Sequence, residues 1–240
     1  MSIFPITSFS QAEQTGGFWL ISLKLSVASP KAQAFDIGCL FGFDSDNQTL
    51  PLFQQTPSES EIQLQLLSQQ AISAEKPPEQ LFVRQPTIKN SSSEILSAAL
   101  SSPNLLILGS ELPMANLFYL AKQRSDLAEG VRTIALLHSQ QGFPFAVKPA
   151  LFMTPDLPAE AIGTSSLLED WKITNRLASD LGLPGCFDGS LSEIFAFWAS
   201  NQPASEAWKI VACTPLETQK KYLEISQQYS WIDFIGIQYS

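Results

Sequence analysis

The sequence is short of the residues that build metal centres and disulfide frameworks. Its 240 residues include only three cysteines and one histidine. Cys39, Cys186 and Cys213 lie far apart and form no C-x-x-C pair. We therefore expect neither a disulfide framework nor a zinc or iron–sulfur site. Catalysis by a histidine-ligated metal is also not expected, because the chain has a single histidine.

Basic residues and long apolar runs are scarce as well. The chain has 14 Lys and Arg against 23 Asp and Glu, giving a formal net charge of -9. Nucleic-acid binding is not expected, because the phosphate backbone requires clustered basic side chains. No apolar run approaches the ~20 residues that cross a bilayer. The first residues also lack a secretory signal, so the sequence predicts a cytoplasmic protein with no membrane span.

Apolar residues are plentiful, at 45% of the chain, which is ample for the core of one large domain or two small ones. Up to about residue 90, short or alternating apolar runs are separated by turn-forming residues. The clearest of these runs cover residues 18–25, 39–43, 62–67 and 81–83. This spacing predicts a small antiparallel β barrel or sandwich.

From about residue 103, predicted strands alternate with predicted helices. The strands are expected at 105–108, 133–138, 150–153 and 209–213, and the helices at 113–124, 165–180, 190–200 and 215–228. Such alternation predicts a parallel-sheet, Rossmann-like α/β domain. A polar segment and a short helix over 94–101 precede it, so we predict a barrel domain over 1–95 and an α/β domain over 96–240.

The stretch around Gly109 reads as a strand, a tight turn and a helix. The apolar run 105–108 suits a strand buried on both faces, and Leu117 and Leu120 recur at helical spacing. A helix N-terminus at this point offers N–H groups to a phosphate. However, the turn holds one glycine, and Glu111 places negative charge where a phosphate would lie. The pattern predicts the scaffold more firmly than an activity.

Four segments, taken in order, resemble motifs of one protein family. Phe35-Asp-Ile-Gly38 resembles an F-x-P-G segment on a barrel, and Val83-Arg-Gln-Pro-Thr87 resembles a later G-P-x-G strand. Residues 105–113 resemble a glycine-rich turn that ends in proline, and residues 210–215 resemble a strand and C-G-P turn that help to position nicotinamide. In these segments the chain resembles the ferredoxin-NAD(P)H reductase superfamily, with particular similarity to the electron-transfer subunit of dihydroorotate dehydrogenase.

This resemblance implies a β barrel that binds FAD, followed by a domain that binds NAD(P)H. The implied cofactor-binding residues are Leu52, Phe53, Gln54 and Gln55 for the flavin, and Gly109, Ser110, Pro113, Cys213 and Thr214 for the nicotinamide nucleotide. The implied function is a flavin-dependent NAD(P)H oxidoreductase or electron-transfer protein, with a redox protein or a small molecule as its partner. No catalytic residue is assigned.

The same segments depart from the family's motifs. Residues 50–56 lack the arginine, tyrosine and serine of the flavin-holding R-x-Y-S motif, and losing an arginine clamp weakens phosphate binding. The turn at Gly109 lacks the second glycine and the threonine, and Cys213 is not followed by glycine. No cysteine cluster ends the chain, so no iron–sulfur cluster is expected. A cofactor-free binding or regulatory protein on this scaffold is the alternative, and altered or lost cofactor use is favoured.

Two further candidates lie near the ends of predicted elements. Residues 182–189 are rich in glycine and precede a helix, so they form either an anion-binding loop or a tight connection, which we favour. Within them, Cys186 is either a reactive thiol or, more commonly for this residue, buried. His138 follows a strand and is either a proton donor or, as we favour, a solvated loop histidine. No G-x-S-x-G turn accompanies it, which disfavours a hydrolase.

Aromatic residues suggest contact surfaces. Residues 142–149 are rich in aromatics and proline and form either a lid or interface loop, or a packed surface crossover. Trp171 and Trp198 are expected as core or interface anchors. The mixed charges of 169–176 are expected on the solvated face of a helix.

Overall fold

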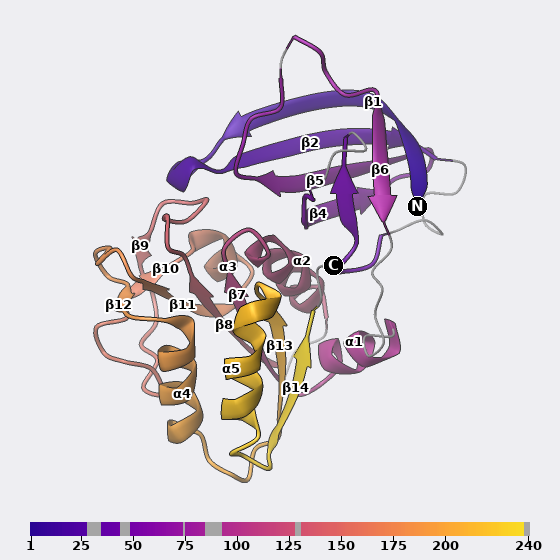
Figure 1. Ribbon diagram of the computed structural model, residues 1–240. Helices are drawn as coiled ribbons and strands as arrows, with labels where there is room; N and C mark the ends of the chain where they lie inside the picture. The colour runs from indigo at the N-terminus through magenta and orange to yellow at the C-terminus, as the bar shows by residue number, and fades with distance from the viewer. Residues whose placement is uncertain (28–34, 44–48, 74, 85–92, 128–130, 238–240) are drawn as a thin grey trace.

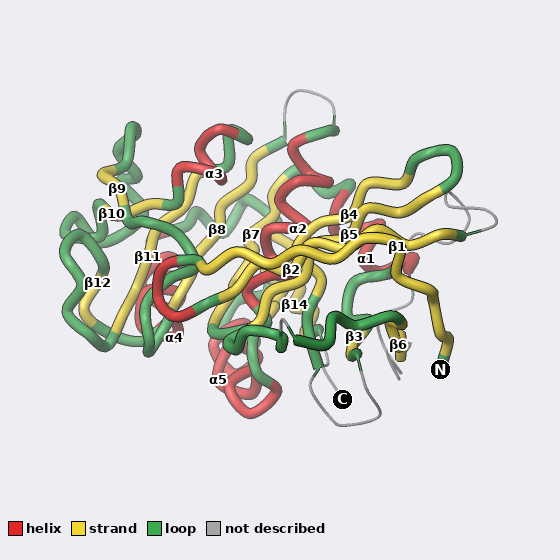
Figure 2. Tube along the Cα trace, turned by 90° about the horizontal axis from the view of Figure 1, so that it is seen from above, coloured by secondary structure: helices red, strands yellow, loops and turns green. Residues whose placement is uncertain are grey.

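The computed structural model describes residues 1–27, 35–43, 49–73, 75–84, 93–127 and 131–237. Two six-stranded sheets dominate it, one built from the N-terminal part of the chain and one from the C-terminal part. In Figure 1 the first sheet lies above the second, with a helix between them. Figure 2, seen from above, shows the strands of the first sheet passing over the second layer.

The first sheet is antiparallel and forms a half-barrel, with strand order β3-β6-β1-β2-β5-β4. Its strands are β1 (Ser2–Glu13), β2 (Trp19–Ser26), β3 (Leu40–Gly42), β4 (Leu52–Pro57), β5 (Glu61–Ser68) and β6 (Gln80–Arg84), with the 3-10 turn η1 (Thr15–Gly17) after β1. Alternate residues of the central strands, such as Leu23 and Leu64, are buried between the layers. One face therefore forms core and the other meets solvent.

The second sheet is parallel, with strand order β12-β11-β8-β7-β13-β14. The elements of this half are α1 (Ser93–Leu100), β7 (Asn104–Ser110), α2 (Met114–Ser125), β8 (Arg132–His138), β9 (Lys148–Pro149), β10 (Gly163–Thr164), α3 (Ser166–Asp170), β11 (Thr174–Ser179), β12 (Phe187–Asp188), α4 (Leu191–Asn201), β13 (Trp208–Cys213), α5 (Leu216–Ser226) and β14 (Ile232–Gly236). Strands β9 and β10 pair as a separate short ribbon. The predicted fold class, a barrel-type sheet followed by a Rossmann-like domain, is confirmed.

The four inner strands of the parallel sheet, β11, β8, β7 and β13, are buried on both faces. Leu105 and Ile107 of β7 belong to the core cluster shared with α2 and the half-barrel. Leu106 and Leu108 belong to a second cluster under α4 and α5. Burial on both faces explains why β7 reads as an unbroken apolar run. The first cluster joins both halves of the chain, and a domain boundary at residue 95 stays a prediction.

Two predicted elements are wrong. The helix expected over 165–180 ends at Asp170, and β11 begins at Thr174 after Lys172 takes a positive φ of 60°. The polar residues Asn175 and Arg176 are buried in β11 rather than placed on a solvated helix face. The strand expected over 150–153 is irregular loop. Strands β1 and β14 were not anticipated.

Neither a membrane-spanning helix nor a candidate metal centre is found within the described ranges. None of the helices placed there is both long enough and apolar enough to cross a bilayer. The same residues contain no group of three or more His, Cys, Asp and Glu side chains arranged to hold a metal ion.

Candidate functional site

The two sheets meet along a ladder of four phenylalanine rings. Phe53 on β4 packs against Phe118 on α2, with ring centroids 5.0 Å apart. Phe118 contacts Phe145 at 5.8 Å, and Phe145 stacks on Phe143 at 5.2 Å. We call these four residues the phenylalanine ladder. It fills the space between β4, α2 and the 142–149 loop with apolar side chains.

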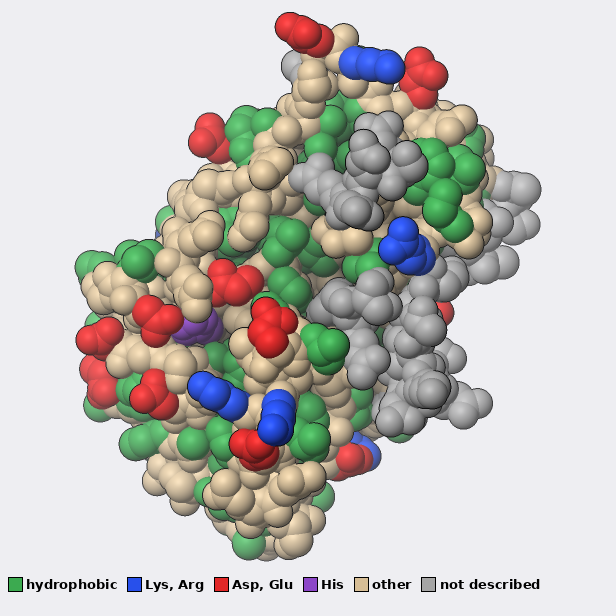
Figure 3. Space-filling model, in the orientation of Figure 1, with side chains coloured by type: hydrophobic (Ala, Val, Ile, Leu, Met, Phe, Trp, Pro, Cys, Tyr) green, Lys and Arg blue, Asp and Glu red, His purple; other side chains and the backbone are tan. Residues whose placement is uncertain are grey.

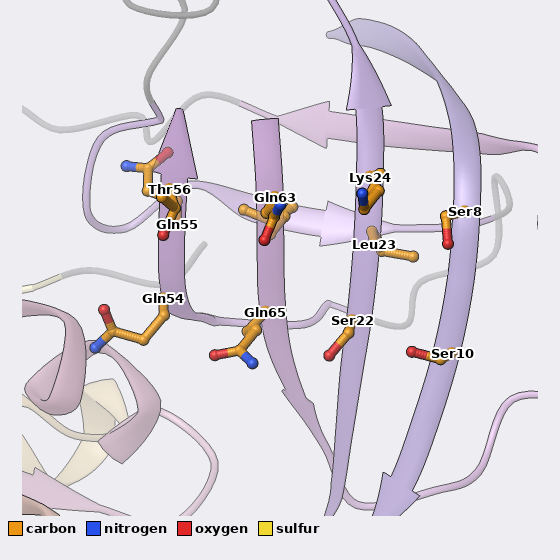
Figure 4. Close-up of a pocket in the computed structure, with 11 residues that line it drawn as sticks. Ser8, Ser10, Ser22, Leu23, Lys24, Gln54, Gln55, Thr56, Gln63 and Gln65 are labelled. Carbon is orange, nitrogen blue, oxygen red and sulfur yellow. The ribbon is translucent and has the colours of Figure 1, made fainter. Parts of the chain in front are cut away.

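Two glutamines of β4 add hydrogen bonds to this contact. The Gln54 amide donates to the carbonyl oxygen of Phe118 at 3.0 Å, and Figure 4 shows its side chain reaching from the strand toward the helix. The Gln55 amide donates to the Phe35 carbonyl oxygen at 2.7 Å and to the Tyr119 hydroxyl. Both glutamines, which the resemblance assigns to flavin binding, therefore bind other residues of this chain.

The 142–149 loop is an interface loop, one of the alternatives that the sequence leaves open. The Thr15 hydroxyl donates to the carbonyl oxygen of Phe143 at 2.8 Å. The next residue, Gly16, has a φ of 66°, and a Cβ there would lie 2.8 Å from the same oxygen. Glycine therefore permits this close approach between the half-barrel and the loop.

The residues on β4 do not fit a flavin. Leu50 and Leu52, which the resemblance places in the R-x-Y-S position, are 1% and 0% exposed and belong to the core. Phe53 packs in the ladder. The strand carries no Lys or Arg to hold a phosphate. A flavin lying along this strand would have to displace the contacts with α2.

The predicted nicotinamide residues do meet at one edge of the parallel sheet. Cys213 at the end of β13 is in register with Gly109 of β7, and Ser110 and Thr214 follow them in the chain, both buried. Pro113 precedes the first residue of α2. This is the carboxyl edge, where open α/β sheets bind their ligands. The structure thus brings these five residues together, and their role in binding a nucleotide stays a prediction.

The backbone at this edge offers little to a pyrophosphate. A Cβ on Gly109 would lie 2.7 Å from Leu117 Cδ1, so the glycine permits packing against α2. The amides of Met114, Ala115 and Asn116 donate at 3.2, 3.2 and 3.0 Å to the carbonyl oxygens three residues earlier. These amides are the donors that a phosphate at a helix N-terminus would need. Here they are already bonded within the turn.

A histidine between two carboxylates occupies the same edge. His138 Nε2 lies 3.1 Å from Asp180 Oδ2, and its Nδ1 lies 3.6 Å from Glu111 Oε1. His138 is only 6% exposed, so the expectation of a solvated loop histidine is wrong. Figure 3 shows the single imidazole with acidic side chains gathered around it. The two carboxylates place negative charge at this edge, which opposes a nucleotide phosphate.

Sequence reasoning missed Asp180 because it lies 42 residues from His138. The sheet topology would have predicted this contact. Residues that end neighbouring parallel strands meet at the carboxyl edge, and β8 and β11 are such neighbours. Taken together, the acidic edge and the bonded turn oppose a nucleotide phosphate at this position.

The glycine-rich segment 182–189 is a tight connection. Gly182 and Gly185 have φ values of 62° and 79°, which glycine adopts readily. Cys186 is buried, and burial raises the pKa of its thiol to about 11, which favours the buried-cysteine alternative over a reactive thiol. Ser190 caps α4 in a capping box with Glu193. Trp198 is fully buried, as expected.

The outward face of the antiparallel sheet holds a shallow polar hollow of about 260 Å³. Figure 4 shows its side chains on neighbouring strands, chiefly Ser8, Ser10, Ser22, Gln63 and Gln65. The cation at this face, Lys24, pairs with Glu61 at 3.1 Å. Serine and glutamine at alternate positions are typical of a solvated antiparallel face.

No protein-family model matches the chain, and no curated protein is similar to it in sequence. Solved structures do resemble it. A cytochrome P450 reductase from Amycolatopsis is 12% identical, with a TM-score of 0.62 over 99% of this chain and 70% of that chain. The ferredoxin reductase in carbazole 1,9a-dioxygenase is 11% identical, with a TM-score of 0.59 and the same coverage.

A third structure, an NADH-dependent reduced ferredoxin-NADP oxidoreductase, is 12% identical, with a TM-score of 0.58 over 98% of this chain and 76% of that chain. At these identities the likeness concerns the fold. The nearer similarity to the dihydroorotate dehydrogenase subunit stays a prediction. This chain therefore has the ferredoxin-reductase fold, a half-barrel followed by a Rossmann-like domain.

Proposed function

We propose that this protein is a cofactor-free binding protein built on the ferredoxin-reductase fold. The observation that carries the proposal is the phenylalanine ladder, which joins β4 to α2 along the strand that the resemblance assigns to FAD. Its ligand is a small molecule or a partner protein. Fold alone does not fix function, so the proposal rests on what the side chains between the sheets do.

Opening the ladder for a flavin is energetically unfavourable. Exposing each buried phenylalanine costs about 1.5–3 kcal/mol, and the bonds from Gln54 and Gln55 to α2 are lost as well. An arginine clamp on the flavin phosphates would offset part of this cost, but β4 carries no basic residue. The balance therefore favours the closed contact.

The first test is the visible absorption spectrum of protein purified without added flavin, repeated after incubation with excess FAD and removal of the unbound fraction. We expect no retained flavin in either sample. Retained flavin that anaerobic NADH or NADPH bleaches would refute the proposal and restore the oxidoreductase interpretation.

A second candidate function, NAD(P)H-dependent electron transfer, is favoured by Thr214. Its Oγ1 is buried at the carboxyl edge and has no hydrogen-bond partner among the residues that the structure describes. A nucleotide hydroxyl or amide would satisfy it. Titration with NADPH, followed by tryptophan fluorescence, tests this candidate. Saturable binding that Thr214→Val weakens would favour it over the cofactor-free function, because valine keeps the shape and removes the hydroxyl.

A further inference from the structure

A pocket of about 440 Å³ lies at the other end of β11, away from the carboxyl edge. Its lining includes Leu151, Phe152, Glu169, Lys172, Ile173 and Arg176. Strand β11 runs from Thr174 beside this pocket to Ser179 next to Asp180, a span of roughly 16 Å at the usual rise per residue. The pocket is therefore separate from the histidine group. Its volume lies within the ~300–1,000 Å³ typical of small-molecule sites.

The loop that forms one wall is anchored through its backbone. The Leu151 amide donates to Glu169 Oε1 at 3.0 Å. The Arg176 guanidinium donates to the carbonyl oxygen of Phe152 and, at 2.6 Å, to that of Asn175. Arg176 is only 4% exposed. Side chains from α3 and β11 thus hold this loop in one conformation.

The same loop exposes three successive apolar side chains. Leu151, Phe152 and Met153 are 75%, 69% and 93% exposed. Adjacent exposed apolar side chains of this size mark binding surfaces more often than ordinary surface does. Because the backbone beneath Leu151 and Phe152 is anchored, binding to them requires little ordering of the loop.

The pocket also carries a cation that is available to a ligand. Lys172 is exposed, and no ion pair to it is found within the described ranges. It follows α3 with a φ of 60°, in a C-terminal cap where the Ile173 amide donates to the Leu168 carbonyl oxygen at 2.8 Å. The one acidic side chain in the lining, Glu169, accepts the Leu151 amide. On a chain with a net charge of -9, this local excess of positive charge is distinctive.

We propose that this pocket binds an organic anion with an apolar body, such as an alkyl or aryl carboxylate. The carboxylate pairs with Lys172, and the body packs on Leu151, Phe152 and Ile173. Charge complementarity selects the anionic group, and the exposed apolar wall selects the body. This inference rests on the proposed binding function and specifies its ligand class.

The test uses octanoate as the probe, below its micelle concentration, with octanol and acetate as matched compounds. Saturation-transfer NMR measures binding to the full chain. We expect octanoate to bind saturably, octanol to bind about ten- to a hundredfold more weakly because it lacks the charge-assisted bond, and acetate to show no binding. Octanol as tight as octanoate, or no binding of octanoate, would overturn the proposal.

Three variants locate the site. Lys172→Gln is expected to weaken octanoate binding about ten- to a hundredfold, and Phe152→Ala about tenfold through lost apolar contact. The control is Lys221→Gln, which removes an exposed lysine from α5 outside the pocket and is expected to leave binding unchanged. Thermal unfolding confirms that each variant is folded. Equal binding by Lys172→Gln and the unmodified chain would refute the assignment.

Two other outcomes are separable from this one. Sedimentation velocity tests whether a second copy of the chain covers the apolar wall, and a dimer that Phe152→Ala dissociates would overturn the small-ligand proposal. Flavin absorption is recorded on the same samples. Retained flavin would refute the cofactor-free function but would not affect the conclusion from octanoate binding. If the protein binds neither flavin nor octanoate, only the proposed ligand class is refuted.

Discussion

Replacing Phe118 with alanine tests whether the ladder is a tightly packed contact. The side chain is 1% exposed and touches a ring from β4 on one side and a ring from the 142–149 loop on the other. Removing it takes away buried apolar surface and leaves a cavity that three elements would have to move to fill. Both effects lower the free energy of unfolding.

The expected loss is about 3–5 kcal/mol, the usual cost of truncating a buried phenylalanine to alanine. For a chain of this size, that corresponds to a decrease in Tm of roughly 6 to 20 °C. Phe118→Leu keeps most of the apolar area and should cost roughly 1 to 2 kcal/mol. Phe197→Ala serves as the matched control, because that ring lies on α4 and is 42% exposed. Its cost should stay below about 1 kcal/mol.

Urea unfolding followed by tryptophan fluorescence measures these values, with circular dichroism as a second probe. Coincident transitions are expected, because one core cluster joins both sheets. The reasoning is refuted if Phe118→Ala costs no more than Phe197→Ala. It is also refuted if the unmodified chain unfolds in two separate steps, since the sheets would then be independent and the ladder a loose contact.

Three other predictions concern positions outside the ladder. The buried Arg124 guanidinium donates to Thr133 Oγ1 at 3.0 Å and to the carbonyl oxygens of Leu100, Ser102 and Pro103. Arg124→Met leaves these acceptors without a donor and should lower the free energy of unfolding, measured in urea, by about 2–4 kcal/mol. Ser190→Ala should cost about 1 kcal/mol and raise the pKa of Glu193, which bonds from Ser190 now lower. NMR titration checks the pKa, and the stability linked to it should be present above about pH 4.5 and lost as the pH falls below that value. Burial raises the pKa of Cys186 from 9.0 to about 11, so the native thiol should react with iodoacetamide far more slowly at pH 8 than the unfolded thiol. The stability linked to this thiol should decrease as the pH rises from 9 toward 11, which urea unfolding across that range would reveal.

The strands of the parallel sheet were predicted best where both faces are buried, because such strands contain a continuous apolar run. Strands β7 and β8 are buried along nearly their whole length, and because both faces are covered each contains an unbroken apolar run. Helix α4 begins where Ser190 and Glu193 form a capping box, a purely local signal. In contrast, β1 alternates between exposed and partly buried residues, and its pattern was too weak to identify.

Polar residues in the core account for the main error. Asn175 is fully buried, and its Oδ1 accepts the Ser165 amide at 2.7 Å, while Arg176 binds the Phe152 carbonyl oxygen. These partners lie 10 and 24 residues earlier in the chain, beyond the reach of helical periodicity, so a local pattern assigns Asn175 and Arg176 to the solvated face of a helix. For the same reason, local sequence patterns did not predict the contact between His138 and Asp180. The contacts of Asn175 and Arg176, and the contact of His138 with Asp180, depend on the topology of the sheet. A local sequence pattern does not predict them.

The residues that the resemblance assigns to cofactor motifs and the phenylalanine ladder are best interpreted together. The half-barrel packs on α2 and on the 142–149 loop, and the space between them must be filled because cavities are destabilising. Where a cofactor occupies such a space, the surrounding side chains can be polar and the glycines open. Here Leu50 and Leu52 enter the core, Phe53 meets Phe118, and Gly109 packs against Leu117. Restoring a single motif residue would therefore not restore a flavin site, because the rings would still fill the volume and the new polar group would be buried without a partner.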